Sequence, residues 1–311
     1  MASDFRKNAL VKRIVKHFPL YFFVLPAIIY FAVFSYVPMY GVQIAFRNYN
    51  PALGVTGSRW VGLKHFRDFF ASYYFVMVFR NTLTVSIYMF IAGFPIPILL
   101  ALILNELRHQ GYKRFCQTVM YAPHFISMVV MCGMIILFLS PSAGIINKWL
   151  EYFGIEGQYF MSSGPAFKHI YVWSGVWQSM GWSTIIYLAA LSNVDPTHQE
   201  AATIDGASRI QKIWHINIPV IIPTVTILMI LRIGDLVGVG FEKAYLLKNS
   251  LNSEYSMVIS TYVYERAFGT NAGIGSMSFS AAINLFNNII NVILLIAANF
   301  LAGKVGETSL F

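Results

Sequence analysis

Charged residues are scarce in this 311-residue chain. Only 11% of its residues are Asp, Glu, Lys or Arg, whereas 57% are hydrophobic. Soluble domains carry about a quarter of their residues as charged ones, so the composition excludes a soluble globular protein and predicts an integral membrane protein. The long apolar runs lack the period-two alternation of barrel strands, so we expect an all-α protein with helices of about 20 residues crossing the membrane.

Motifs for covalent or metal chemistry are also missing. No GxxxxGK[ST] phosphate-binding loop occurs, so any ATP must be bound by a separate protein. The only two cysteines, Cys116 and Cys132, fall in one apolar run without CxxC spacing or a His cluster, and we interpret them as inert apolar side chains. His124 has no clustered acid or second histidine that would favour a membrane enzyme. We therefore expect no catalytic residue and no metal site.

About six apolar runs are long enough to span a membrane. They are Phe18–Tyr40, Thr82–Leu104, Phe115–Leu139, His169–Leu191, Ile218–Val239 and Ala281–Leu301. An even number of spans and the Lys- and Arg-rich tail 1–17 predict that both termini are cytoplasmic, with a membrane domain over 18–303 and a second tail at 304–311. The loops Gly41–Phe79 and Phe241–Ser280 are then external, although the first also contains basic residues. Basic flanks on anionic lipid explain the net charge of +9 without a nucleic-acid partner.

A polar segment, 192–217, interrupts the apolar pattern between the fourth and fifth predicted spans. Asp195 is placed to cap a short helix with Pro196 at its first position. Gly206 then permits the positive φ of a tight turn. The Asp205 carboxylate is expected to accept the backbone N–H groups of Ala207 and Ser208 as a second helix starts. The segment therefore predicts a helix, a sharp turn and another helix on the cytoplasmic side.

This segment carries a family resemblance. Glu200-Ala201-Ala202, Asp205-Gly206-Ala207 and the run 216–219 (INIP) resemble the EAA loop of permease subunits of binding-protein-dependent ABC importers. The stretches YVPMYGVQIAFRNYNP, GSRWVGLKHFRDFF, GWSTIIYLAALSNVDP and FEKAYLL are similar to the carbohydrate-uptake branch, specifically its LplB-like oligosaccharide and polysaccharide permeases. Asn217 and Ile218 depart from the usual residues of the loop without changing its pattern.

The resemblance implies a bacterial cytoplasmic (inner) membrane protein that works in an assembly. The expected partners are a second homologous permease, a dimer of ATPase subunits that bind ATP and Mg, an extracytoplasmic solute-binding protein and an oligosaccharide. It also implies that the segment is a coupling helix that docks on the ATPase, with the candidate residues Glu200, Ala201, Ala202, Asp205, Gly206, Ala207 and Arg209. A solvated hairpin without a partner is the alternative, but it does not explain the small Ala face.

Polar residues within spans are the candidates for a sugar pathway, because such residues normally face the bundle interior or a watery cavity. One face of the sixth span carries the amides of Asn284, Asn287, Asn288 and Asn291, which suit a hydroxyl-rich ligand or, alternatively, hydrogen bonding between helices. Trp177 and Gln178 are either sugar contacts or structural residues. Arg232 and Asp235 are expected to neutralise one another, the alternative being contact with an anionic sugar.

The cargo is the least determined property. The resemblance implies an oligosaccharide, and the basic residues of the outer loops favour an acidic one, such as a fragment derived from alginate or pectin. An ion-coupled secondary transporter of a polar solute is the alternative function. It would need a coupling-ion site in broken helices, for which the Arg232 and Asp235 pair is the only candidate.

Overall fold

The computed structural model describes residues 16, 18–270 and 273–305. The regular elements of the described part are helices apart from one antiparallel pair of two-residue strands, β1 (Arg47–Asn48) and β2 (Arg59–Trp60). The predicted tails 1–17 and 304–311 lie almost wholly outside the described residues. The expected all-α membrane fold is confirmed, whereas the number of spans stays a prediction.

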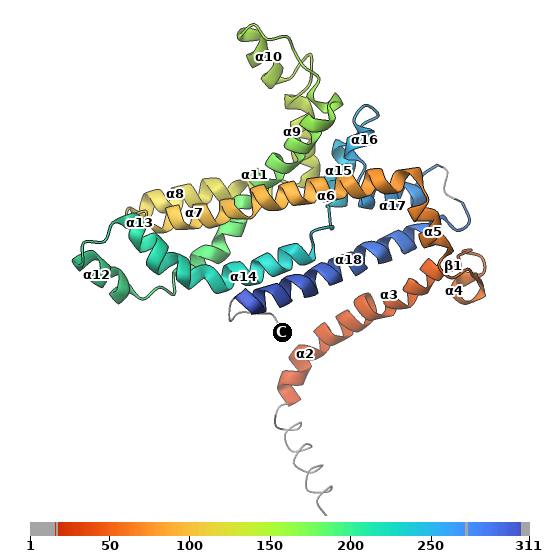
Figure 1. Ribbon diagram of the computed structural model, residues 1–311, viewed down its shortest axis with the longest axis horizontal. Coiled ribbons are helices and arrows are strands. Elements are labelled where there is room, and N and C mark those ends of the chain that lie inside the picture. Colours follow the sequence, from red (N-terminus) through yellow and green to blue (C-terminus); the bar gives the residue numbers. More distant parts are fainter. Residues whose placement is uncertain (1–15, 17, 271–272, 306–311) are drawn as a thin grey trace, which may run out of the picture.

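Four long helical segments form the body of the molecule (Figure 1). They are α6 (Tyr73–Gly93) with its continuation α7 (Pro95–Asn105), α11 (Gly164–Leu191), α14 (Ile218–Gly234) and α18 (Ser276–Val305). Helix α11 packs against α6, α7 and α14, and α14 packs against α18. The side chains of Phe167, Ile221, Ile230 and Ile283 are fully buried between them. The core is therefore a helical bundle whose long axes run side by side.

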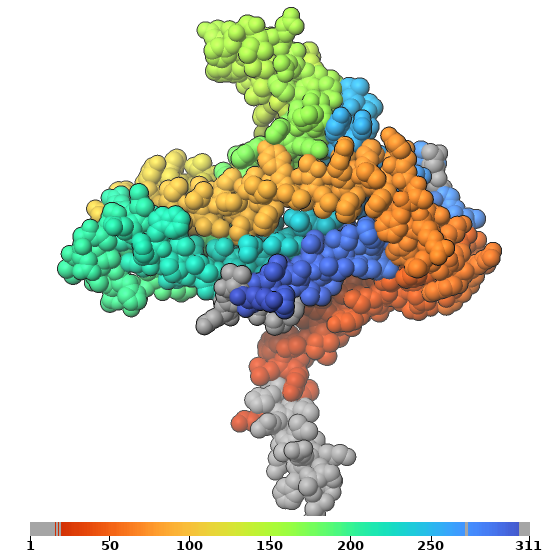
Figure 2. All heavy atoms as spheres, viewed as in Figure 1, coloured from red at the N-terminus to blue at the C-terminus, as the bar shows by residue number. Residues whose placement is uncertain are grey.

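The first predicted span lies along one side of this bundle. It comprises α2 (Phe18–Phe31), the turn η1 (Ala32–Tyr36), α3 (Val37–Met39) and the turn η2 (Tyr40–Phe46). Helix α2 is apolar yet exposed along its length, and the segment meets the bundle mainly where η2 packs on α18. Figures 1 and 2 show α2 leaving the body of the protein. Such an apolar, uncovered helix needs lipid or another chain around it.

The span boundaries agree with the sequence to within about two turns. In the described part of the chain, four helical stretches are long and apolar enough to cross a membrane: Leu20–Phe46, Tyr73–Asn105, Arg209–Gly234 and Ser276–Lys304. The 28-residue α11 covers the predicted fourth span. The second span begins at Tyr73 rather than Thr82, because Ser72 caps it by accepting the N–H of Tyr74. The predicted outer loop Gly41–Phe79 is therefore shorter at both ends.

The third predicted span, Phe115–Leu139, is not one continuous helix, although its two halves together are long and apolar enough for one broken span. The chain forms α8 (Gln110–Tyr121) and α9 (Met128–Phe138), which meet at a bend of 94°. Pro123 lies in the intervening turn η3 (Ala122–Phe125), where its ring removes a helical hydrogen-bond donor. Ser127 then starts α9 by accepting the N–H of Val130. Figure 2 shows the following segment around α10 (Ile145–Tyr152) projecting from the bundle, whereas α9 packs against α15 (Phe241–Leu247) and buries Met131 and Cys132 in the core.

Shorter elements cover the end of the bundle that is opposite to the segment 192–217. They are α4 (Gly54–Gly57), α5 (Lys64–Phe70), the turn η4 (Phe160–Ser162), α15 (Phe241–Leu247), α16 (Ser253–Ser256) and α17 (Ile259–Phe268). The opposite end of the bundle carries α12 (Pro196–Ile204), α13 (Arg209–Lys212) and the π-helical turn η5 (Ile213–Asn217). Figure 1 places these two groups at opposite ends of the long helices.

Candidate functional site

The segment 192–217 begins as the sequence predicted. The Asp195 carboxylate accepts the backbone N–H of Thr197 at 2.9 Å and caps α12, with Pro196 at the first helical position. This hydrogen bond lowers the pKa of Asp195. The cap fixes where α12 starts, directly after the end of α11.

The turn between α12 and α13 confirms the role of Gly206 and corrects that of Asp205. Gly206 has φ +74°, and the N–H groups of Gly206 and Ala207 donate to the carbonyls of Thr203 and Ala202. This is a Schellman closure, which needs a left-handed residue at the position of Gly206. The prediction that Asp205 accepts the N–H groups of Ala207 and Ser208 is wrong, because Ala207 closes this turn instead.

The second helix of the loop is capped by a different residue. The Ser208 hydroxyl accepts the N–H of Gln211, and the Gln211 side chain accepts the N–H of Ser208 at 2.7 Å. This reciprocal capping box satisfies the N–H of Ser208, which was predicted to donate to Asp205. Lys212 also donates to the Thr203 hydroxyl at 3.0 Å. The two short helices are thereby held together as one unit.

This unit presents a largely uncovered surface. Glu200, Ala201, Asp205, Gly206 and Arg209 are exposed, whereas Ala202 and Ala207 are half-buried. Three large apolar side chains are also exposed on the loop and the turn after it, namely Ile204, Ile210 and Trp214, at 86%, 69% and 62%. A polar loop that places three large apolar side chains in the open has the composition of a docking surface.

A chain of amide hydrogen bonds connects the loop to the bundle. Gln199 of α12 donates to the Asn217 side-chain oxygen at 2.7 Å, and the Asn217 amide donates to the Glu106 carboxylate at 3.2 Å. Asn217 is fully buried. It lies immediately before α14, and Glu106 directly follows α7. A displacement of α12 therefore reaches two spans through one buried side chain.

A cavity of about 520 Å³ lies between α6, α11, α14 and α15. Gln178, Arg232 and Asp235, all predicted from the sequence, line it together with Ser86, Tyr171 and Lys243. Trp177 and the four asparagines do not belong to this lining. The structure thus places three of the predicted pathway residues in one cavity and the other five outside its lining.

The asparagines of α18 divide into two pairs. Asn291 accepts the backbone N–H of Val237 at 3.1 Å, and Asn287 donates to the Val237 carbonyl at 3.5 Å. These two amides therefore bond the chain just beyond the end of α14. Asn284 and Asn288 are exposed on the same helix, and their role in the pathway stays a prediction.

The remaining pathway candidates occupy different environments. Gln178 donates to the Ile126 carbonyl at 2.8 Å and so braces the break between α8 and α9. Trp177 is 42% exposed.

Arg232 and Asp235 were expected to pair, but among the described residues only Lys248 and Glu265 form an ion pair. The reason is that α14 ends at Gly234, so Asp235 lies beyond the helix and not one turn along it.

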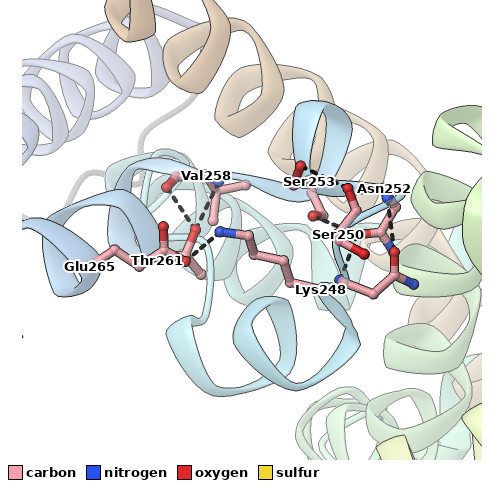
Figure 3. Close-up of polar contacts among 9 residues, drawn as sticks. Lys248, Ser250, Asn252, Ser253, Val258, Thr261 and Glu265 are labelled. Carbon is pink, nitrogen blue, oxygen red and sulfur yellow. Dashed lines mark hydrogen bonds and ion pairs between the residues drawn. The ribbon is translucent and has the colours of Figure 1, made fainter. Parts of the chain in front are cut away.

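The outer segment between α15 and α17 is held in place by polar contacts (Figure 3). Lys248 and Glu265 form the ion pair across it. The buried Asn252 accepts the N–H of Asn249 and donates to the carbonyls of Leu247 and Met161. A surface that is ordered before binding loses less entropy when a partner docks.

Sequence reasoning missed several residues of these sites, among them Lys243, Asn217 and Glu106. Lys243 stood in the stretch FEKAYLL, in a loop predicted to be external, so its burial gave no signal in the sequence. Asn217 was noted only as a departure from the usual residue of the loop. Glu106, in the short link after the second span, had no visible partner because Asn217 is distant in the chain.

Known proteins resemble this chain over nearly its whole length. Residues 93–305 match the family described as "Binding-protein-dependent transport system inner membrane component". The polygalacturonan/rhamnogalacturonan transport system permease protein YteP of Bacillus subtilis (strain 168) is 43% identical over 308 residues, covering 98% of this chain and 94% of YteP. Protein LplB of the same organism is 40% identical, covering 94% and 91%.

A solved structure has the same fold. It is a chain of a bacterial ABC transporter involved in the import of the acidic polysaccharide alginate, with a TM-score of 0.86 and 38% identity over 96% of this chain and 99% of that one. The same transporter in complex with an alginate pentasaccharide-bound periplasmic protein matches with 37% identity and a TM-score of 0.86. The chain therefore belongs to the binding-protein-dependent transport system inner membrane components, as a permease subunit of the carbohydrate-uptake branch of ABC importers.

Proposed function

We propose that this permease imports an acidic, uronate-containing oligosaccharide and is driven by ATP hydrolysis in separate subunits that dock on the segment 192–217. The observation that carries the proposal is the presence, in one chain, of two features on the same long helices. One is the uncovered unit formed by α12 and α13, here called the coupling unit, and the other is the polar cavity. Helices α11 and α14 reach from one to the other. Movement of the coupling unit thus acts directly on the cavity walls.

The uncovered surface of the coupling unit supports an ATPase as its partner. The exposed side chains of Ile204, Ile210 and Trp214 supply apolar contact area, and the exposed charges of Glu200 and Arg209 lie beside them. One such unit engages one ATPase subunit. A pair of ATPases therefore requires a second, homologous permease, which also supplies the other wall of the pathway.

Two relatives support an acidic cargo. YteP is described as transporting polygalacturonan and rhamnogalacturonan, and the solved relative imports alginate, an acidic polysaccharide. Polygalacturonan and alginate are polymers of uronic acids, so they share a carboxylate on each sugar unit. In the solved complex the sugar is carried by a periplasmic protein, and the ordered outer segment of the present chain offers a surface for an equivalent partner.

Reconstitution in proteoliposomes tests this function. The complete complex contains the second permease, the ATPases and the binding protein. It should import a galacturonate trisaccharide only when ATP is present on the side of the membrane on which the segment 192–217 lies. A neutral trisaccharide of galactose should be imported more slowly. Equal import of the two sugars would refute an acidic cargo, and ATP-independent import by this chain alone would favour the secondary transporter.

A further inference from the structure

Lys243 is a buried ammonium group at the wall of the cavity. It lies on the first turn of α15 and is only 5% exposed. Its Nζ donates to the backbone carbonyl of Tyr171 on α11 and lies 4.6 Å from the centroid of the Tyr171 ring. Lysine is almost never buried to this degree unless its charge is paired. The position therefore requires an explanation.

Gly175 makes room for this lysine. A Cβ atom added at Gly175 would come within 3.0 Å of Lys243 Nζ and 2.9 Å of Met89 Cε. Glycine within a helix is less stable than alanine, and here it opens α11 at the level of the ammonium. The site is thus built by both helices, with one supplying the cation and the other the space for it.

No carboxylate of the described residues forms an ion pair with the Lys243 ammonium. The only ion pair among residues 16, 18–270 and 273–305 joins Lys248 to Glu265. Glu242 precedes Lys243, but neighbouring residues of a helix do not face each other, and Glu242 is exposed whereas Lys243 is buried. The other charged residues of the lining are Glu242, Arg232 and Asp235; all three are exposed, and none of them forms an ion pair with Lys243.

The ammonium keeps its charge although burial opposes it. Desolvation lowers the pKa of Lys243 to about 8, so most of the group is protonated at neutral pH. Its polar contacts in the protein are a carbonyl oxygen and an aromatic face, which stabilise a cation without cancelling its charge. A ligand with a carboxylate would supply the missing anion.

A second polar group of the same cavity lacks a partner. The Ser86 side chain on α6 is 8% exposed, and its hydroxyl has no hydrogen-bond partner among the described residues. Buried hydroxyl groups normally have a partner because an unsatisfied one destabilises the folded protein. The cavity therefore offers an unneutralised cation and an unsatisfied hydroxyl, which match the carboxylate and the hydroxyls of a uronic acid.

We propose that Lys243 binds the carboxylate of a uronate unit in the cavity, while the Ser86 hydroxyl bonds a sugar hydroxyl. Lys243 is then the residue that favours an acidic sugar over a neutral one, and Ser86 contributes to the binding of both sugars. This assignment rests on the proposed import of an acidic oligosaccharide and adds the residue that selects it. The alternative role of Lys243 is a structural clamp that joins α15 to α11.

Equilibrium binding to the purified permease and ATPase complex, without binding protein, separates these roles. We expect the wild-type complex to bind a galacturonate trisaccharide about tenfold more tightly than a galactose trisaccharide. Lys243→Met should abolish this preference and leave galactose binding unchanged, whereas Lys243→Arg should keep it. Lys148→Met removes the same charge at an exposed site on α10, outside the cavity lining, and should have no effect.

Other outcomes refute the assignment. Equal losses for both sugars in Lys243→Met would identify a structural clamp, and an unchanged preference would show that the carboxylate binds elsewhere. If Lys243→Met does not assemble, Lys243→Gln keeps a donor for the Tyr171 carbonyl and answers the same question. Ser86→Ala should weaken binding of both sugars by about threefold, and unchanged binding would remove Ser86 from the site.

Failure of the assignment differs from failure of the proposed function. If the wild-type complex alone shows no preference but the binding-protein-dependent system imports the acidic sugar faster, the Lys243 assignment is wrong and the function stands. If the complete system imports both sugars equally, the acidic cargo itself is wrong.

Discussion

Replacing Gly206 by valine isolates the contribution of one backbone conformation to transport. Gly206 has φ +74°, and a Cβ atom added there would meet no heavy atom within 4 Å. The cost in this chain is therefore conformational and not steric. A left-handed residue other than glycine costs about 1–2 kcal/mol, and a β-branched one up to about 3 kcal/mol.

This energy is enough to displace the coupling unit. Each 1.4 kcal/mol changes an equilibrium about tenfold, so Gly206→Val should reduce the population of the native turn by about one to two orders of magnitude. We expect import and substrate-stimulated ATP hydrolysis to fall, while the amount of protein in the membrane persists because the bundle does not depend on the turn.

A matched substitution controls for side-chain size. Asparagine adopts positive φ more readily than other residues with a side chain, so Gly206→Asn should retain more activity than Gly206→Val. Unchanged stimulated ATP hydrolysis in Gly206→Val would refute the role of this turn in transmission. Equal loss in both variants would instead indicate that a docked partner leaves no room for any side chain.

Three further predictions address the rest of the chain. Asn217→Ala should uncouple ATP hydrolysis from import by removing two hydrogen bonds of about 1 kcal/mol or more each, and full coupling in this variant would contradict the connection through Asn217. Asn291→Leu should lower the thermal stability of the complex because it removes the acceptor for Val237, whereas Asn288→Leu, at an exposed site, should weaken import at low sugar concentration if that side chain faces the pathway. If Asn288→Leu lowered the stability and Asn291→Leu weakened import, the roles assigned to these two residues would be exchanged. Cysteines at the exposed positions Ala52 and Ser250 should react with an impermeant thiol reagent in spheroplasts, and labelling only after lysis would invert the topology.

Sequence alone was sufficient wherever one residue's local chemistry decides the structure. Asp195 and Pro196 predict the start of α12, because a capping carboxylate and a fixed φ act within a few residues. Gly206 predicts the turn for the same reason. The prediction for Asp205 was wrong because two local solutions compete for the same N–H groups, and the Schellman closure and the Ser208 capping box satisfy them.

Helix ends inside the apolar runs were harder to place. Hydropathy gives the length of an apolar run but does not show whether the helix through it is continuous. The break between α8 and α9 was therefore missed, although Pro123 marks it in the sequence. The early end of α14 was missed too, and with it the separation of Asp235 from the helix that carries Arg232. In both places an apolar run continues past the point where backbone hydrogen bonding changes.

The sequence by itself determined that this protein crosses the membrane, that its spans are helical and that its coupling loop has a defined turn, because these depend on composition and on neighbours within a few residues. Only the tertiary structure decided which polar side chains share an environment. Lys243 is buried because α11 lacks a side chain at Gly175, and Asn217 connects two spans because Glu106, far away in the chain, lies beside it. The burial of a charge and the partner of an amide depend on how distant segments pack together. The pattern of residues along one helix carries no information about that packing.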